Sequence, residues 1–263
     1  MRTTWLLLTC SLLLLASPIA AEPYPATMAQ RPLVLNQGMF QAGADVDLGM
    51  NKDRALKDLG VGLSIAYGVT KDLELGLDVG ALSYGKDAQG AKLGGATIYG
   101  RYRFIEMLAA QLDIYFPGDH GYLDSFGDQL IGVTLGLPFQ YIAVENMLKI
   151  HAMLGFDAAF VKDTYATSGG ESPQMNVLVG YGVTYNPMQA LFLDLSSGTI
   201  LGLKPSAGSM GDRAAMPLAF TVGGTLLDGS MDVYVALRVA NLKPPAGGAF
   251  DTKSIGVGAL YRF

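Results

Sequence analysis

Two histidines and one loop rich in carboxylates are the residues of this chain whose types allow acid–base chemistry. Asp119 and His120 are adjacent, and Asp124 and Asp128 follow in the same polar stretch. A carboxylate beside an imidazole can activate water for hydrolysis, and carboxylates this close together can hold calcium. The stretch lacks both the further acidic partners of a hydrolase and the strict spacing of a calcium loop. We therefore predict a solvated turn here, with no catalytic residue and no metal site.

The second histidine, His151, lies two residues after Lys149 in a stretch where apolar and polar residues alternate. A serine–histidine hydrolase would need a serine beside it, and we find none placed there by the alternation. The single cysteine, Cys10, lies near the amino terminus, which excludes disulfides and thiolate zinc sites from the rest of the chain. The sequence thus predicts no enzyme and no cofactor.

Polar residues occur at every second position of many apolar stretches, and this pattern is the main signal of the chain. From Leu73 to Ala81, apolar residues alternate with Glu74, Gly76, Asp78 and Gly80. Successive side chains of a strand point to opposite faces, so the pattern predicts strands with one apolar and one polar face. About twelve such stretches follow one another, and a short link between two of them makes them antiparallel neighbours.

The links between these stretches alternate in length. We expect short links around Lys71, Glu106, Asn146, Pro187 and Asp228, and longer polar ones around Asp53, Lys86, Asp124, Gly169, Ser209 and Gly247. Short turns on one side and longer loops on the other are typical of bacterial outer-membrane barrels. Aromatic residues, including Tyr67, Tyr102 and Tyr261, fall at the ends predicted to lie near the short turns, where an aromatic girdle belongs.

Composition favours a membrane barrel. Half of the residues are hydrophobic and only 16% are charged, yet no apolar run long enough for a membrane helix follows the amino terminus. A barrel resolves this contradiction because its apolar surface is spread over alternate residues of short strands. The alternative is a soluble lipocalin-like or sandwich fold, whose polar face would carry Lys and Glu where this chain has Gly, Ala and Thr.

Three parts of the chain are expected. Residues 1–21 read as a cleaved signal peptide, with an apolar run that ends in small residues before Glu22. Residues 22–38 contain three prolines without alternation, and we expect a periplasmic lead-in or, alternatively, a segment that folds into the barrel mouth. Residues 39–263 then form an all-β, transmembrane antiparallel up-and-down barrel of about 12 strands with both termini in the periplasm. The net charge of −5 argues against a nucleic-acid partner.

The polar face of the strands predicts the lining of the barrel interior. Opposite charges facing one another across a narrow lumen must be solvated or paired, so they form either a selective constriction or a set of closing salt bridges. We expect Glu74 or Asp78 to pair first with Arg101 or Arg103 on an adjacent strand. Small residues on other strands leave space for a path. The predicted pore-lining residues are Glu74, Asp78, Arg101, Arg103, Gln111, Asp113, Lys149, His151, Asp194, Asp232, Arg238 and Arg262.

Several stretches of the sequence resemble a broad family of outer-membrane proteins. The stretches from Tyr67 to Gly80, Tyr99 to Phe104 and Tyr115 to Gly121, together with the terminal Ala-Leu-Tyr-Arg-Phe, are similar to transporters associated with the phenol meta-cleavage pathway. The resemblance implies an uptake channel for small solutes, including hydrophobic or aromatic compounds. Such a protein would contact lipid and lipopolysaccharide, and its last strand would be recognised by the barrel-assembly machinery. A closed barrel that acts through its outer loops is the alternative.

Overall fold

The computed structural model describes residues 24–51, 54–85, 90–92, 94–117, 129–161, 172–204, 214–244, 248 and 251–263. Outside these residues lie the predicted signal peptide and the loop with Asp119 and His120. The central positions of all six predicted long links lie outside them as well. Within the described part, no helix has the length and apolar character needed to span a membrane, a finding that does not bear on crossing by strands.

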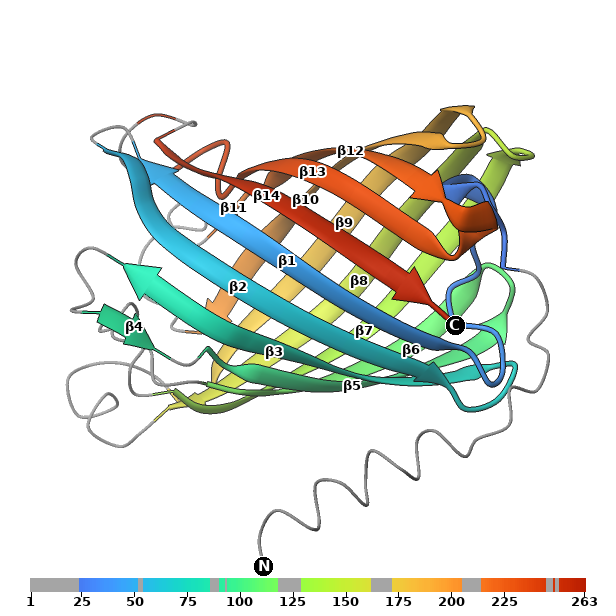
Figure 1. Ribbon diagram of the computed structural model, residues 1–263. Coiled ribbons are helices and arrows are strands. Elements are labelled where there is room, and N and C mark those ends of the chain that lie inside the picture. Colours follow the sequence, from blue (N-terminus) through green and yellow to red (C-terminus); the bar gives the residue numbers. More distant parts are fainter. Residues whose placement is uncertain are drawn as a thin grey trace, which may run out of the picture.

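The chain forms a closed antiparallel barrel of twelve wall strands, as predicted (Figure 1). Each strand pairs with the next in the chain, and the last pairs with the first. Two short strands, β4 (Gly90–Lys92) and β11 (Ala214–Ala215), extend the sheet beside β3 and β10. The wall consists of β1 (Phe40–Asn51), β2 (Arg54–Gly68), β3 (Leu73–Gly85), β5 (Ala96–Ile105), β6 (Leu108–Phe116), β7 (Gln129–Val144), β8 (Leu148–Val161), β9 (Gln174–Met188), β10 (Leu191–Lys204), β12 (Leu218–Leu226), β13 (Met231–Val239) and β14 (Thr252–Arg262).

The closing seam joins β1 to β14 in an unbroken register from Gln41 opposite Arg262 to Asn51 opposite Thr252. Beyond the ladder, the backbone N–H of Phe40 donates to the carbonyl of Phe263 at 2.9 Å, and the reverse bond is 3.0 Å. The rings of Phe40 and Phe263 are stacked with centroids 5.7 Å apart. The final strand therefore leaves no free sheet edge, which is the condition for a stable barrel.

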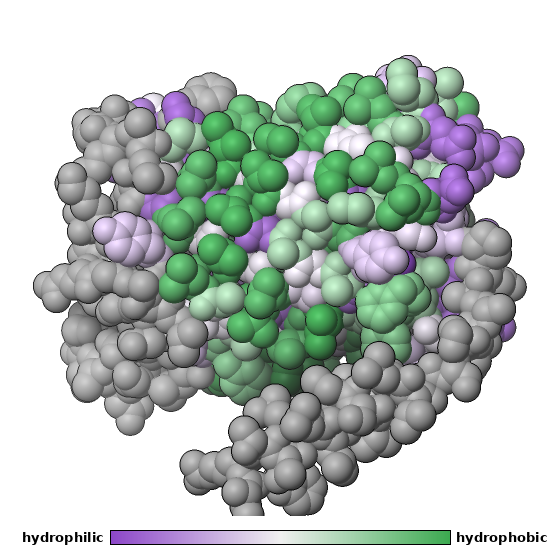
Figure 2. Space-filling model, viewed as in Figure 1, coloured by the Kyte–Doolittle hydropathy of each residue, from purple (hydrophilic) through white to green (hydrophobic). Residues whose placement is uncertain are grey.

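The apolar side chains point outward. Ile65, Leu135, Leu154 and Val257 expose more than half of their surface, and Figure 2 shows a mainly hydrophobic outer surface over the strands. This placement excludes the lipocalin-like alternative, because such a fold would bury these residues. The aromatic residues Tyr102, Phe104, Tyr185, Tyr261 and Phe263 also lie on the outer surface, as expected for a girdle.

The short links form turns near the predicted positions. Residues 106–107, 145–147 and 227–230 connect their strands, and a turn follows Gly68. The prediction at Pro187 was wrong by a few residues, since β9 continues to Met188 and the turn lies at 189–190. Proline is tolerated there because a strand end needs fewer ladder hydrogen bonds than a strand centre.

Residues 24–38, called here the mouth segment, lie inside the barrel end at which the chain terminates (Figure 1). The segment contains one short 3-10 helix, η1 (Met28–Gln30). Leu35 is buried with Met39 and with Ala66 of β2, and Tyr24 and Tyr99 pack against this cluster. Of the two placements considered from the sequence, the structure shows the barrel mouth.

Candidate functional site

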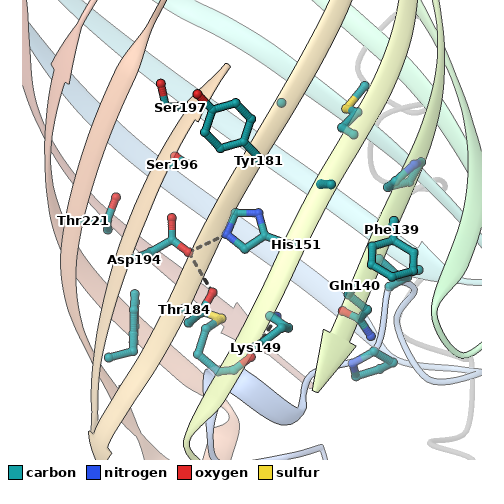
Figure 3. Close-up of a pocket in the computed structure, with 18 of the residues that line it drawn as sticks. Phe139, Gln140, Lys149, His151, Tyr181, Thr184, Asp194, Ser196, Ser197 and Thr221 are labelled. Carbon is teal, nitrogen blue, oxygen red and sulfur yellow. Dashed lines mark hydrogen bonds and ion pairs between the residues drawn. The ribbon is translucent and has the colours of Figure 1, made fainter. Parts of the chain in front are cut away.

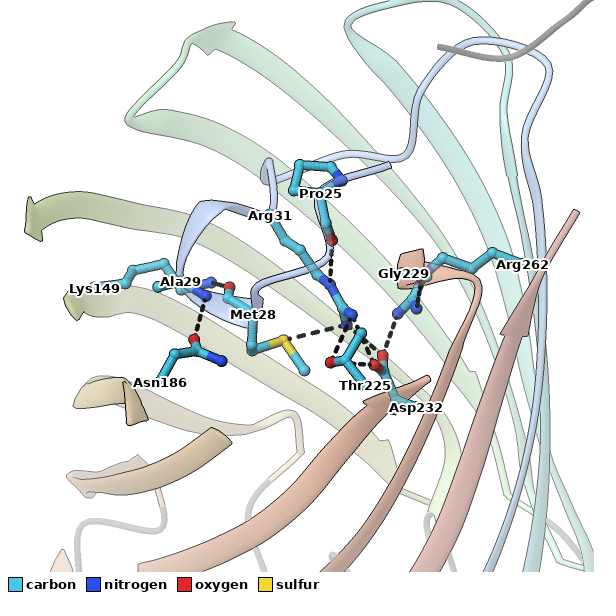
Figure 4. Close-up of polar contacts among 10 residues, drawn as sticks. All are labelled: Pro25, Met28, Ala29, Arg31, Lys149, Asn186, Thr225, Gly229, Asp232 and Arg262. Carbon is cyan, nitrogen blue, oxygen red and sulfur yellow. Dashed lines mark hydrogen bonds and ion pairs between the residues drawn. The ribbon is translucent and has the colours of Figure 1, made fainter. Parts of the chain in front are cut away.

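A buried ionic cluster fixes one side of the mouth segment to β12–β14 (Figure 4). Arg31 forms a two-bond ion pair with Asp232, in which Nη2 donates to Oδ1 at 2.7 Å. Arg262 reaches the same carboxylate at 2.8 Å, and the hydroxyl of Thr225 donates to it at 3.0 Å. Asp232 is fully buried and both arginines are almost fully buried. Such charge-assisted bonds are strong where the surroundings exclude water.

Tyr24 completes this cluster by lying against both guanidinium groups. The Cζ atoms of Arg262 and Arg31 lie 4.9 and 5.5 Å from the centre of its ring. A ring face attracts cations, and this offsets part of the repulsion between two arginines that share one carboxylate. Burial raises the pKa of the Tyr24 phenol, so the ring remains neutral beside Asp232.

Other strands, on the opposite side of the barrel, hold the backbone of the mouth segment. Glu74 of β3 accepts a 2.7 Å hydrogen bond from the N–H of Leu35, and Arg101 of β5 donates to the carbonyl of Leu33 at 2.9 Å. Glu74 and Arg101 also pair with each other at 3.7 Å, which is the ion pair expected from the sequence. The wall side chains thus satisfy backbone groups that the segment, lacking regular structure, does not pair itself.

A third set of contacts comes from β8 and β9. The ammonium group of Lys149 donates to the carbonyl of Met28 at 3.0 Å, and the N–H of Ala29 donates to the side chain of Asn186 at 2.9 Å (Figure 4). Ala29 and Asn186 are buried. Anchors on β3, β5, β8, β9, β12 and β13 therefore surround the segment.

Next to the mouth segment, the barrel interior contains a cavity of about 710 Å³. His151 lies on its wall, with Nε2 2.9 Å from a carboxylate oxygen of Asp194 (Figure 3). The same oxygen accepts a 2.7 Å hydrogen bond from the hydroxyl of Thr184. Apolar groups, including Phe192 and Met153, line the cavity beside these polar ones. The lining can therefore contact both polar and apolar parts of a small molecule.

The half of the barrel away from the mouth segment, called here the far half, has several carboxylates among its lining residues. Asp45, Asp47 and Asp78 border a cavity of about 430 Å³, and Asp113 and Asp157 border one of about 340 Å³. Asp47 is paired with Arg238 of β13. Asp157 accepts hydrogen bonds of 3.0 Å from Thr134 and from Asn176.

The structure places the twelve predicted lining residues in three settings. Glu74, Arg101, Lys149, Asp232 and Arg262 contact the mouth segment or its ionic cluster. Gln111, His151, Asp194 and Arg238 line the large cavity, with Asp78 and Asp113 farther along. Arg103 instead lies at the rim, where it pairs with Asp72 at 3.0 Å.

The predicted lining omitted several charged residues of the interior, among them Asp157, which also follows the alternation. Asp45 and Asp47 follow the same alternation as the predicted residues, so the pattern was sufficient to find them. Arg31 lies in a segment without periodicity, and no sequence signal pointed to its pairing with Asp232. Among the described residues, no group of three or more histidine, cysteine or acidic side chains is placed to hold a metal ion.

Comparisons with known proteins show the fold. No family model and no curated protein matches the chain. The COG4313 outer membrane channel from Pseudomonas putida F1 is similar with a TM-score of 0.61 and 14% identity, over 88% of this chain and 97% of that one. The NanC porin is similar with a TM-score of 0.57 and 11% identity, over 83% and 98%. The KdgM porin in complex with disordered oligogalacturonate is similar with a TM-score of 0.54 and 10% identity, over 85% of this chain and 99% of that one. The chain therefore has the fold of outer-membrane porins and channels.

Proposed function

We propose that this protein is an outer-membrane channel for the passive uptake of small solutes. The observation that carries the proposal is the division of the two faces: apolar residues such as Leu135 point outward, while polar residues such as His151 and Asp194 line an interior cavity. Lipid requires the first face, and a wet path through the barrel requires the second. The fold shared with the NanC and KdgM porins supports this function.

The finer proposal concerns the solute. The sequence resemblance to transporters of the phenol meta-cleavage pathway implies hydrophobic or aromatic compounds. The side chains of Phe192, Met153 and Leu260 border the large cavity and offer apolar contacts, while His151 and Asp194 offer hydrogen bonds. A small aromatic molecule that carries a polar group would use both kinds of contact.

We further propose that both termini lie in the periplasm. The mouth segment and Phe263 lie at the same end of the barrel as the short turns at 106–107 and 145–147. Short turns face the periplasm in barrels of this type. Outer-membrane lipid, lipopolysaccharide and the barrel-assembly machinery are then the expected contacts of the outer surface and the last strand.

A closed barrel is the second candidate, and the mouth segment favours it. The segment is held from several sides of the barrel by anchors at Asp232, Glu74, Lys149 and Asn186. A barrel closed in this way would act through its outer loops or its surface.

Electrical recording distinguishes the two candidates. Purified protein is added to a planar lipid bilayer in potassium chloride, and current is recorded at fixed voltage. A channel gives discrete conductance steps, whereas complete absence of steps would contradict the channel proposal and favour the closed barrel. Swelling of proteoliposomes in solutions of neutral solutes of graded size then measures which molecules pass. Phenol derivatives that reduce the ionic current would support the finer proposal.

A further inference from the structure

A further cavity lies at the rim of the mouth, between the mouth segment, the β5–β6 hairpin and the end of β7. It has a volume of about 520 Å³, and Arg103, Glu106 and Asn36 are among the residues that border it. Two residues, Pro32 of the mouth segment and Gln140 of β7, border both this rim cavity and the large interior cavity. These two residues therefore form part of the barrier between the two spaces, at a place called here the gap.

Gln140 is placed to act as the movable part of this barrier. It lies opposite His151 in the β7–β8 register, on the inner face of the strand, and its side chain is buried. Its amide nitrogen reaches the carbonyl of Glu106 at 3.4 Å, at the long end of hydrogen-bond distances. Among the described residues this is the one hydrogen bond of the Gln140 side chain, so a change of rotamer would forfeit little hydrogen-bond energy.

Pro32 forms the other side of the gap. Proline has no backbone N–H, so Pro32 cannot donate a hydrogen bond across to β7. The anchors of the mouth segment instead involve the two neighbours of Pro32. Arg31 donates to Asp232, and the carbonyl of Leu33 accepts a hydrogen bond from Arg101. The chain is thus held on both sides of Pro32, while the proline itself presents an apolar ring to the gap.

We propose that solutes leave the interior between Pro32 and Gln140, and that Gln140 sets the size of the solute that passes. This inference rests on the proposed channel function. The mouth segment stays seated on its anchors, and the route runs beside it through the rim cavity. Solutes emerge next to Arg103, whose guanidinium group is already neutralised by Asp72. The exit therefore restricts solutes mainly by size and by contact with an amide.

The test introduces a single thiol at the gap. In Gln140→Cys the only other cysteine is Cys10, within the predicted signal peptide. A cationic methanethiosulfonate reagent is added to bilayers that contain this variant. Leu137→Cys is the matched control, because Leu137 lies on the outer face of the same strand, 45% exposed, and borders neither cavity. We expect conductance through Gln140→Cys to fall roughly twofold or more on modification, with no change for Leu137→Cys.

Two further results complete the test. Gln140→Ala shortens the side chain without adding charge, and its conductance should exceed that of the unaltered protein. If mass spectrometry shows complete modification of Gln140→Cys while its conductance is unchanged, or if Gln140→Ala conducts as the unaltered protein does, the proposed exit is wrong and the channel function stands. If the unaltered protein gives no conductance, the channel function itself fails.

Discussion

Asp232 is the single residue on which the seating of the mouth segment depends most. Its carboxylate binds both Arg31 and Arg262, so Asp232→Asn leaves two buried guanidinium groups without a counter-charge. Removal of one partner of a buried ion pair costs about 3–5 kcal/mol, and 3 kcal/mol corresponds to roughly a hundredfold change in an equilibrium. We expect a protease of broad specificity to cleave residues 24–38 of the folded variant much faster.

The control for this prediction is the same substitution in the far half of the barrel. Asp157→Asn removes a carboxylate that accepts hydrogen bonds from Thr134 and Asn176, away from the mouth segment. Its cleavage rate should equal that of the unaltered protein. Equal rates for Asp232→Asn and the unaltered protein would show that the ionic cluster does not hold the segment.

Gly229 permits a close approach between the η2 turn and the mouth segment. Its φ is +99°, and a Cβ there would lie 2.7 Å from the carbonyl oxygen of Tyr24. Gly229→Ala therefore combines backbone strain with a backbone clash, and we expect a loss of stability of about 1 kcal/mol or more. Gly60→Ala is the control, since its Cβ would meet nothing within 4 Å. Thermal unfolding followed by circular dichroism should show a lower midpoint for the first variant only.

At the scale of the strand, neighbouring residues of β7 test the assignment of faces. Leu135 is 57% exposed on the outer surface, while Thr134 lies opposite Asp157 and Asp113 in the two adjacent registers. Arginine facing lipid near the bilayer centre costs about 2–4 kcal/mol, whereas an inward arginine would lie between two carboxylates. We expect Leu135→Arg to lower the yield of folded barrel in liposomes and Thr134→Arg to fold. Equal yields would contradict the assignment.

The strands were predictable from the sequence because each one repeats a period of two that both lipid and a wet interior impose on it. Leu73 to Ala81 shows this directly, and the expected pair of Glu74 with Arg101 follows from adjacent strands in register. The mouth segment was not predictable in the same way. Its contacts depend on isolated groups, such as Arg31 with Asp232, that are distant in sequence and meet only after the barrel closes.

At the scale of the whole molecule, charge is unevenly distributed along the interior. The cationic groups Arg31, Arg262 and Lys149 lie at the mouth segment, two of them on Asp232 and one on a backbone carbonyl. Two cavities of the far half are bordered by five aspartates and, among their described lining residues, by no lysine or arginine. A third, of about 450 Å³, is bordered by Asp58 together with Arg238 and Lys253. An ion that passes through the two aspartate-bordered cavities therefore meets a negative potential there.

This distribution predicts a preference for cations. Fixed carboxylates in a narrow passage with walls of low dielectric concentrate counter-ions and repel anions. In a gradient of potassium chloride, the reversal potential should have the sign of potassium permeation. The double variant Asp78→Asn with Asp113→Asn should move it toward zero, because both carboxylates border the far cavities. Asp228→Asn, at an exposed turn, should leave it unchanged. A reversal potential of the sign of chloride permeation in the unaltered protein would show that these aspartates do not control the passage of ions.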